Sequence, residues 1–216
     1  METLASRLAA LRSEYARAGL SEGDLAPAPL PQLERWLADA IAAGIRDPHA
    51  FTLATASADG APNGRIVLMK GIDGRGVTFF TNYDSAKGQE LAANPRACGV
   101  LFWNDLERQV RFLGSVEKVT RAESEAYFHS RPRGSQLGAL ASKQSSVVPS
   151  RTDLDLKLAE LTAQLEGGPV PLPECWGGYR FLPHTMEFWQ GRPNRMHDRL
   201  RYVAAGESWR IERLAP

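Results

Sequence analysis

Residues 51–82 read FTLATASADGAPNGRIVLMKGIDGRGVTFFTN, and this stretch decides the fold. It holds three short runs rich in β-branched, aromatic and other apolar residues, at 51–57, 64–70 and 76–82. Asp59-Gly60 and Asp73-Gly74 separate the runs, and Asp-Gly is a strong signal for a tight turn between antiparallel strands. The stretch therefore predicts three consecutive antiparallel strands.

On the N-terminal side of these strands, Leu33, Trp36, Leu37, Ala40 and Ile41 have the spacing of an amphipathic helix, and Asp47-Pro48 ends it. On the C-terminal side, the pattern predicts helices at 85–93, about 121–129, 135–142 and 152–166, and strands at 97–103, 108–119, 177–182, 185–191, 199–205 and 208–214. Many short strands with helices at the joins favour an α+β, mainly β barrel with peripheral helices. A doubly wound sheet is not supported, because no strand–GxGxxG–helix unit is present.

Composition is that of an ordinary globular protein: 216 residues, 43% hydrophobic and 24% charged, with a net charge of +1. The small net charge points to neither nucleic acid nor membrane as a partner, so any anion site must be a local cluster. No apolar run is long enough to span a bilayer, and two cysteines are too few for a disulfide framework. We expect a cytoplasmic protein, since the N-terminus lacks the apolar core of a secretory signal.

Cationic residues gather in several short segments of the chain. Arg65 and Lys70 flank one predicted strand, on opposite faces, so one ligand meets both only at a bend or groove. Lys87 follows a predicted helix start, where free N–H groups suit a phosphate. Tyr127 and Arg131 share one helical face before Pro132, and Ser135 begins the next helix. Each segment alone also fits a solvated surface charge, and 142–146 (SKQSS) alone is only a polar loop.

Near the C-terminus, residues 187–199 read EFWQGRPNRMHDR. If this run is extended, Arg195, His197 and Arg199 lie on one face, because every second side chain points the same way. Two guanidiniums and an imidazole beside Trp189 suit a planar, anionic, aromatic ligand; the alternative is an exposed basic strand edge. The sequence contains no His/Cys set with metal-ligand spacing and no GxSxG elbow. A phosphorylated cofactor and a phosphorylated substrate fit these clusters best.

The segments RIVLMK, FFTNYDSAKG, NPRACGVLFW, ERQVR, YFHSRPRGSQLGA, SKQSS, PECWGGYRF and EFWQGRPNRMHDR, in this order and spacing, resemble the pyridoxine/pyridoxamine 5′-phosphate oxidase family of FMN-binding split barrels. The resemblance covers nearly the whole chain. It implies a homodimer with FMN at the subunit interface and O₂-dependent oxidation of pyridoxine or pyridoxamine 5′-phosphate to pyridoxal 5′-phosphate. It also implies a partly mobile segment at 1–25, an oxidase domain at 26–216 and a dimerisation region from about 170 to 216.

The resemblance also assigns site residues by motif. FMN would be held by Arg65, Ile66, Val67, Leu68, Met69, Lys70, Phe80, Thr81, Lys87, Gln109, Gln144, Ser145, Trp189 and Arg199, the last four from the partner subunit. The substrate would meet Arg12, Tyr15, Lys70, Tyr127, Arg131, Ser135, Arg195, Met196 and His197. In this reading Arg195 and His197 are the catalytic pair at the pyridine ring. His197 either contacts the reacting substituent, transfers a proton or positions Arg195.

The chain departs from the family pattern at two positions. Ala86 stands where the family commonly has Arg, and Phe80 stands where Tyr is common. The first departure removes one expected cation from the phosphate of FMN and predicts weaker FMN retention. Two alternatives to the oxidase remain: a related split-barrel FMN oxidoreductase with another substrate, such as a phenazine precursor, and a non-catalytic carrier of flavin or pyridoxal phosphate.

Overall fold

The computed structural model describes residues 4–10, 15 and 19–216. Its residues form two compact units: unit 1 comprises Met1–Pro48, Val100–Phe112 and Thr185–Pro216, and unit 2 comprises His49–Gly99 and Leu113–His184. No helix in the described ranges combines the length and the apolar character that crossing a membrane requires. Each described candidate site residue belongs to one of these two units and is placed within it.

Unit 2 is built on the antiparallel strands that residues 51–82 predict. β1 (Ala50–Ala56) pairs with β2 (Pro62–Asp73), and β2 pairs with β3 (Gly76–Asn82). β3 also pairs with the first part of β6 (Trp176–Gln190). With β4 (Arg96–Trp103) and β5 (Arg108–Lys118), the strand order β3-β2-β1-β4-β5-β6 and the β3–β6 pair close six strands into a barrel. The predicted α+β, mainly β barrel is confirmed.

Aromatic side chains fill the interior of unit 2. Phe79 packs edge-on against Phe51, with ring centroids 6.0 Å apart, and stacks on Tyr179 at 5.7 Å. Gly114 of β5 lies where two backbones approach closely. A Cβ on Gly114 would stand 2.0 Å from the carbonyl oxygen of Leu182, so no other residue fits there.

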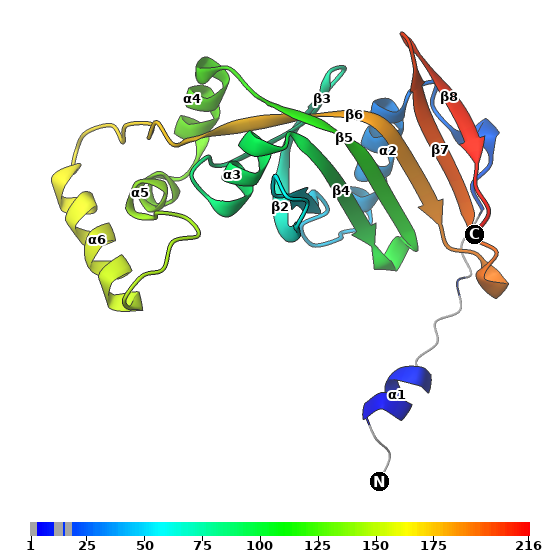
Figure 1. Ribbon diagram of the computed structural model, residues 1–216, viewed down its shortest axis with the longest axis horizontal. Helices are drawn as coiled ribbons and strands as arrows, with labels where there is room; N and C mark the ends of the chain where they lie inside the picture. The colour runs from blue at the N-terminus through cyan, green and yellow to red at the C-terminus, as the bar shows by residue number, and fades with distance from the viewer. Residues whose placement is uncertain (1–3, 11–14, 16–18) are drawn as a thin grey trace. The chain divides into compact units, whose positions relative to one another are not determined.

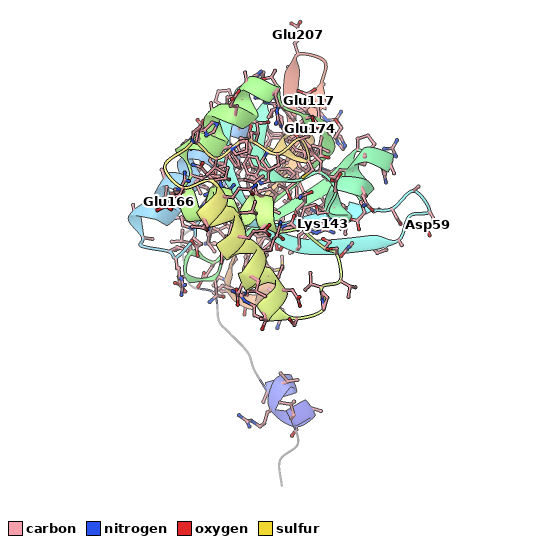
Figure 2. All side chains as sticks on the ribbon, turned by 90° about the vertical axis from the view of Figure 1, so that its left-hand side faces the viewer. Asp59, Glu117, Lys143, Glu166, Glu174 and Glu207 are labelled. Atoms are coloured by element: carbon pink, nitrogen blue, oxygen red, sulfur yellow. The ribbon has the colours of Figure 1, made fainter. Side chains whose placement is uncertain are left out.

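The described helices of unit 2 are α3 (Ala86–Ala93), α4 (Arg121–Ser130), α5 (Arg133–Ala141) and α6 (Arg151–Gln164), with α5 and α6 packed side by side (Figure 1). Side chains of α4, α5 and α6 pack in a second, smaller apolar cluster. Phe128, Leu137, Val170 and Trp176 are its buried members. Figure 2 labels Lys143 in the loop that joins α5 to α6, and Asp59 at the tip of the β1–β2 hairpin.

Unit 1 combines α1 (Leu4–Ala10), α2 (Pro29–Ala42), β7 (Asp198–Ala205), β8 (Ser208–Arg213) and the 3₁₀ turns η1 (Glu22–Asp24), η2 (Asn104–Leu106) and η3 (Pro193–Arg195). Proline opens α2 at its first turn, where its missing N–H costs nothing. Trp36 of α2 packs edge-on against Phe188, with centroids 5.1 Å apart, and Phe188 packs on Tyr202 at 5.6 Å. These rings join α2 to the antiparallel β6–β7 pair.

Two sequence predictions about the C-terminal region are wrong. The strands predicted at 177–182 and 185–191 are one strand, β6, because Pro183 loses only a donor and leaves the backbone extended. Residues 195–199 are not one extended run either. Asn194 and Arg195 have φ of 56° and 59°, and β7 begins only at Asp198. Pro193 and the left-handed tolerance of Asn194 form a turn there, so alternation does not place Arg195 and His197 on a common strand face.

The N-terminus of α4 gives a pH-dependent stability test. Glu123 caps α4, and the hydrogen bond from Arg180, followed by those from Thr120, lowers its pKa to about 2. A carboxyl with a lowered pKa stabilises the fold fully above its unfolded value of 4.5, and the contribution disappears as the pH falls toward 2. Because the side chain is 37% exposed, solvent screening limits the contribution to about 1 kcal/mol. In urea unfolding, Glu123→Gln should lower the free energy of unfolding by this amount at pH 7, and the variant and the parent protein should be equally stable near pH 2.

Glu125 supplies the matched control for this test. It lies on the same helix, is 61% exposed and has His129 as a partner 3.9 Å away. Glu125→Gln should leave the free energy of unfolding unchanged at both pH values. A stability difference between Glu123→Gln and the parent protein that persists undiminished at pH 2 would contradict the assignment.

Candidate functional site

A cavity of about 940 Å³ opens in unit 2, within the range of small-molecule and cofactor sites. Strands β2 and β3, the start of α3, the α4–α5 junction and the loop after α5 contribute to it, together with Trp176 at the start of β6. Its lining brings together most of the unit 2 residues that the sequence singles out: Arg65, Ile66, Val67, Leu68, Lys70, Phe80, Thr81, Lys87, Tyr127, Arg131, Ser135, Gln144 and Ser145. Segments far apart in the sequence thus form one site.

The charges of this cavity are all of one sign. Its described lining contains four cations, Arg65, Lys70, Lys87 and Arg131, and neither Asp nor Glu. Four positive charges in a chain of net charge +1 confirm that cations are concentrated locally. Such a cavity favours a multiply charged anion, because like charges raise one another's free energy until a counter-charge binds.

Lys87 is the most buried of these cations, at 8% exposure. Its ammonium donates to Gln144 at 2.9 Å, to Thr81 at 3.2 Å and to Ser85 at 3.3 Å, all neutral acceptors. Burial first, and the charge of Arg65 second, lower the pKa of Lys87, while Glu90 opposes the shift. An ammonium held among neutral groups gains from an anionic ligand.

Arg65 is fixed by residues outside the cavity lining. Its guanidinium pairs with Glu90 of α3 at 2.9 Å and donates to the carbonyl of Leu53 at 3.2 Å and to the hydroxyl of Thr55. Glu90 in turn accepts from Asn63 at 2.8 Å. This network joins β1, β2 and α3, so Arg65 is preorganised for a ligand.

The conformation of β2 explains how one ligand can contact both Arg65 and Lys70. The pairing of β2 with β3 shifts register between Met69 and Gly71, a bulge beside Lys70, and both cations line the same cavity. The bend that the sequence requires is therefore present. Met69 behaves differently: its side chain is 4% exposed, belongs to the core and is not part of the lining.

At the other end of the lining, Tyr127, Arg131 and Ser135 meet where α4 ends and α5 begins. The guanidinium carbon of Arg131 lies 4.8 Å from the ring centre of Trp176. Burial lowers the pKa of Arg131, and its Nη1 is buried without a hydrogen-bond partner among the described residues. Gln144 and Ser145, which the resemblance takes from a partner subunit, reach this cavity within one chain.

The remaining FMN candidates, Gln109, Trp189 and Arg199, belong to unit 1. Trp189 and Arg199 face each other in register on β6 and β7. Arg199 donates to Glu187 at 2.8 Å, and Arg111 pairs with the same carboxylate at 2.6 Å. Glu187 is 3% exposed, and although burial opposes it, the two arginines lower its pKa. One buried carboxylate thus orients two guanidiniums.

Among the substrate candidates of unit 1, Tyr15 contacts His197. Its ring packs edge-on against Trp189 at 5.6 Å and against His197 at 5.3 Å. His197 accepts a hydrogen bond at Nδ1 from the N–H of Arg192 at 3.1 Å, which assigns the proton of the neutral ring to Nε2. Burial first, then Arg195, lower the pKa of His197. Arg195 and Met196 are exposed, and Arg12 lies outside the described residues.

Sequence reasoning missed two residues that contact the site. Trp176 lines the cavity and carries Arg131, and Glu90 holds Arg65. Trp176 has a visible signal, since it belongs to the PECWGGYRF segment at the start of a predicted strand. Glu90 has none, because a glutamate on an exposed-looking helix is ordinary in sequence.

Two family models match the chain. Residues 37–165 match the model described as "Pyridoxamine 5′-phosphate oxidase". Residues 176–216 match the model described as "Pyridoxine 5′-phosphate oxidase C-terminal dimerisation region". The first match contains the lining of the unit 2 cavity except Trp176, and the second contains Trp176 together with Trp189 and Arg199.

Curated relatives extend the similarity over nearly the whole chain. A protein of Rubrobacter xylanophilus named pyridoxine/pyridoxamine 5′-phosphate oxidase is 53% identical, over 97% of this chain and 96% of that protein. Proteins of the same name from Synechocystis and Ralstonia pickettii are 54% and 55% identical, over 97% of this chain and 98% and 99% of theirs.

Solved structures show the same fold. PhzG from Burkholderia lata, in complex with tetrahydrophenazine-1-carboxylic acid, superposes with a TM-score of 0.88 at 35% identity, covering 94% of this chain and all of that one. An FMN-binding protein of Nostoc punctiforme, related to pyridoxamine 5′-phosphate oxidase, has a TM-score of 0.69 at 14% identity. That structure covers 89% of this chain and 100% of its own, and supports the fold alone.

Proposed function

This chain belongs to the pyridoxamine 5′-phosphate oxidase family, and we propose that it oxidises pyridoxine or pyridoxamine 5′-phosphate to pyridoxal 5′-phosphate. FMN is the cofactor, and O₂ is the final acceptor, giving H₂O₂, with ammonia released from the amine. The observation that carries the proposal is the 940 Å³ cavity lined by four cations and, in the described chain, no carboxylate. It suits two phosphate esters, one on the cofactor and one on the substrate.

The residues present fit FMN. Lys87 holds a buried ammonium among neutral acceptors, and Arg65 is fixed by Glu90, so both supply charge-assisted donors for a phosphate. We assign the cofactor to these two with Ile66, Val67, Leu68, Met69, Lys70, Phe80, Thr81, Gln109, Gln144, Ser145, Trp189 and Arg199. Met69 would contribute backbone only, since its side chain is in the core. When bound, FMN would supply the oxidising power for the loss of a hydride from the C4′ carbon.

The residue at position 86 tests the cofactor assignment. Ala86 lines the cavity where the family commonly has Arg. A guanidinium there adds a charge-assisted hydrogen bond, so Ala86→Arg should lower the FMN dissociation constant about tenfold. Fluorescence titration of apoprotein with FMN measures it. Ala93→Arg, on the same helix, should leave the constant unchanged; equal effects of the two variants would contradict the assignment.

The substrate's phosphate would be held by Lys70, Tyr127, Arg131 and Ser135, which all line the cavity. Arg131 has a buried, unpartnered Nη1 there, which a phosphate oxygen would satisfy. We assign the pyridine ring to Arg195 and His197, with Met196, Tyr15 and Arg12 as further contacts. These residues orient C4′ and exclude water, and no side chain needs to act as a nucleophile.

His197 is assigned as a hydrogen-bond donor through Nε2, because Nδ1 is occupied by the N–H of Arg192. A Gln side chain can replace the Nε2–H, whereas Asn can replace only the acceptor at Nδ1. His197→Gln should therefore keep kcat/KM within about fivefold of the parent, while His197→Asn lowers it about 50-fold. Steady-state kinetics of both variants measure this. The reverse order would mean that His197 only holds the turn.

We propose further that the protein is a homodimer with FMN at the subunit interface, and that it is cytoplasmic. The match of 176–216 to a dimerisation region supports the dimer. Residues 26–216 would form the oxidase domain, with dimerisation residues from about 170 onward, while much of the N-terminal segment predicted at 1–25 lies outside the described residues. Light scattering of the purified holoprotein tests the dimer, and a monomer would contradict it.

The decisive experiment on function is a visible spectrum followed by an oxidation assay. The purified protein should be yellow, and pyridoxine 5′-phosphate under air should yield an aldehyde and peroxide in equal amounts. The PhzG structure contains tetrahydrophenazine-1-carboxylic acid, so this compound is the competing substrate to assay. Turnover of that compound alone would favour the alternative oxidoreductase. Binding of the phosphate ester without turnover would favour a carrier.

A further inference from the structure

Three aromatic rings line the cavity with nearly parallel planes. Phe80 of β3 and Tyr127 of α4 have ring centres 3.9 Å apart and planes 19° apart. Trp176 lies 5.6 Å from Phe80 and 6.2 Å from Tyr127, at angles of 13° and 6°. We call these three residues the aromatic shelf. It joins three elements of unit 2 at one wall of the cavity.

Trp176 has a second partner, the guanidinium of Arg131, whose carbon lies 4.8 Å from its ring centre. A second ring, Phe128, lies 5.6 Å from the same carbon. Against these rings Arg131 keeps a buried Nη1 with no hydrogen-bond partner in the described part of the chain. A guanidinium that is held by ring faces and lacks a protein counter-charge stays available to an anion.

Trp176 itself is held rigidly. It is 6% exposed and packs with Phe128, Leu137 and Val170 in the smaller apolar cluster of unit 2. Its backbone N–H donates to Pro173 at 3.1 Å, and its carbonyl accepts from Arg121 at 3.1 Å. The indole therefore has little conformational freedom, and it restricts the guanidinium of Arg131 that packs on its face.

We propose that Trp176 is a positioning residue for the substrate's phosphate: its indole face fixes the guanidinium of Arg131, and the stacked rings fix Tyr127 beside it. The inference rests on the proposed function and deepens it. Its consequence is selectivity, because only a substrate with a phosphate gains from an ordered Arg131. Loss of the indole should thus weaken phosphorylated ligands and leave pyridoxine itself unaffected.

The test compares Trp176→Met, which fills space without a π face, with Trp176→Phe, which keeps a smaller one. For the holoprotein, Trp176→Met should raise the dissociation constant of pyridoxal 5′-phosphate and the KM of pyridoxine 5′-phosphate about tenfold. Trp176→Phe should raise them about threefold, because a smaller ring attracts a cation less. The kcat, the FMN dissociation constant and the kcat/KM for unphosphorylated pyridoxine should stay within about twofold of the parent values.

Two controls separate positioning from general packing. Trp209 of β8, outside the cavity lining, gives the matched variant Trp209→Met, which should change none of these constants. In an Arg131→Ala background, Trp176→Met should add less than about twofold to the KM, since the residue it positions is gone. If Trp176→Met does not fold, the threefold selective effect of Trp176→Phe decides alone.

The possible outcomes distinguish a failure of the role proposed for Trp176 from a failure of the proposed oxidase activity. Equal losses for phosphorylated and unphosphorylated substrates, or weaker FMN binding, would overturn the inference and leave the oxidase intact. A parent protein that binds pyridoxal 5′-phosphate without oxidising the substrate would overturn the function. In that case a tenfold weaker binding by Trp176→Met would still support the inference. A parent that binds no pyridoxal 5′-phosphate overturns both.

Discussion

Replacement of Arg195 by leucine is expected to lower kcat/KM about 300-fold while the FMN dissociation constant stays within about twofold. Arg195 has an exposed side chain on a residue with φ of 59°, next to Asn194 at 56°. Left-handed backbone at a residue other than glycine costs stability and is retained mainly where function requires it. Its charge already acts on His197, whose pKa it helps to lower. Steady-state kinetics and an FMN titration measure the two constants.

Two variants refine this expectation. Arg195→Lys keeps the charge but loses the planar fork, so it should retain only part of the activity. Arg210→Leu removes an exposed guanidinium from β8 and should leave kcat/KM unchanged. If the FMN dissociation constant of Arg195→Leu rises by the same factor as kcat/KM falls, Arg195 serves the cofactor and not the substrate.

Replacement of Lys87 by methionine should weaken FMN binding and at the same time stabilise the apoprotein. Lys87 is 8% exposed, and among the described residues its ammonium donates to the neutral acceptors of Thr81, Ser85 and Gln144. Loss of this charge should raise the FMN dissociation constant about 100-fold. The apoprotein should become more stable by about 1 kcal/mol, because a buried cation without a counter-ion is costly. Titration with FMN and urea unfolding of the apoprotein measure the two effects.

The control for this variant is Lys157→Met. Lys157 is 50% exposed on α6 and pairs with Glu160 at 2.8 Å, so its removal should change neither FMN affinity nor apoprotein stability appreciably. A less stable Lys87→Met apoprotein would show that the ammonium stabilises the fold through its hydrogen bonds. The account of Lys87 as a charge awaiting an anion would then be wrong.

Local patterns were sufficient for most of the fold. Asp-Gly turns and runs of apolar residues mark β1, β2 and β3. The predicted end of α2 at Asp47-Pro48 is wrong, because the helix already ends at Ala42 and Gly44 follows with a φ of 71°. Prediction from local patterns failed at two prolines, because the conformation around a proline depends on its tertiary contacts. Pro183 lies inside β6, which continues through it, while Pro193 opens a turn that displaces Arg195 and His197 from a strand. In both cases distant pairing, which no local pattern contains, decides the conformation.

For the candidate site, the sequence identified the cations but not their environment. That Lys87 is buried, that Arg131 rests on Trp176 and that Glu90 holds Arg65 all depend on contacts between segments far apart in the chain. Motif resemblance named most of the cavity lining because a family's motifs summarise such contacts. It omitted Trp176 and Glu90, which act on other side chains and not directly on a ligand.

The continuity of β6 also bears on how chain length can vary in evolution. Trp176 begins this strand and Trp189 lies near its end, and along a strand each residue faces opposite to its neighbours. Deletion or insertion of one residue between them would reverse the facing of every later side chain, Glu187 and Trp189 included. Gaps in homologous genes should therefore fall at hairpin tips such as Asp59 and Glu207, which Figure 2 labels, and spare residues 176–190.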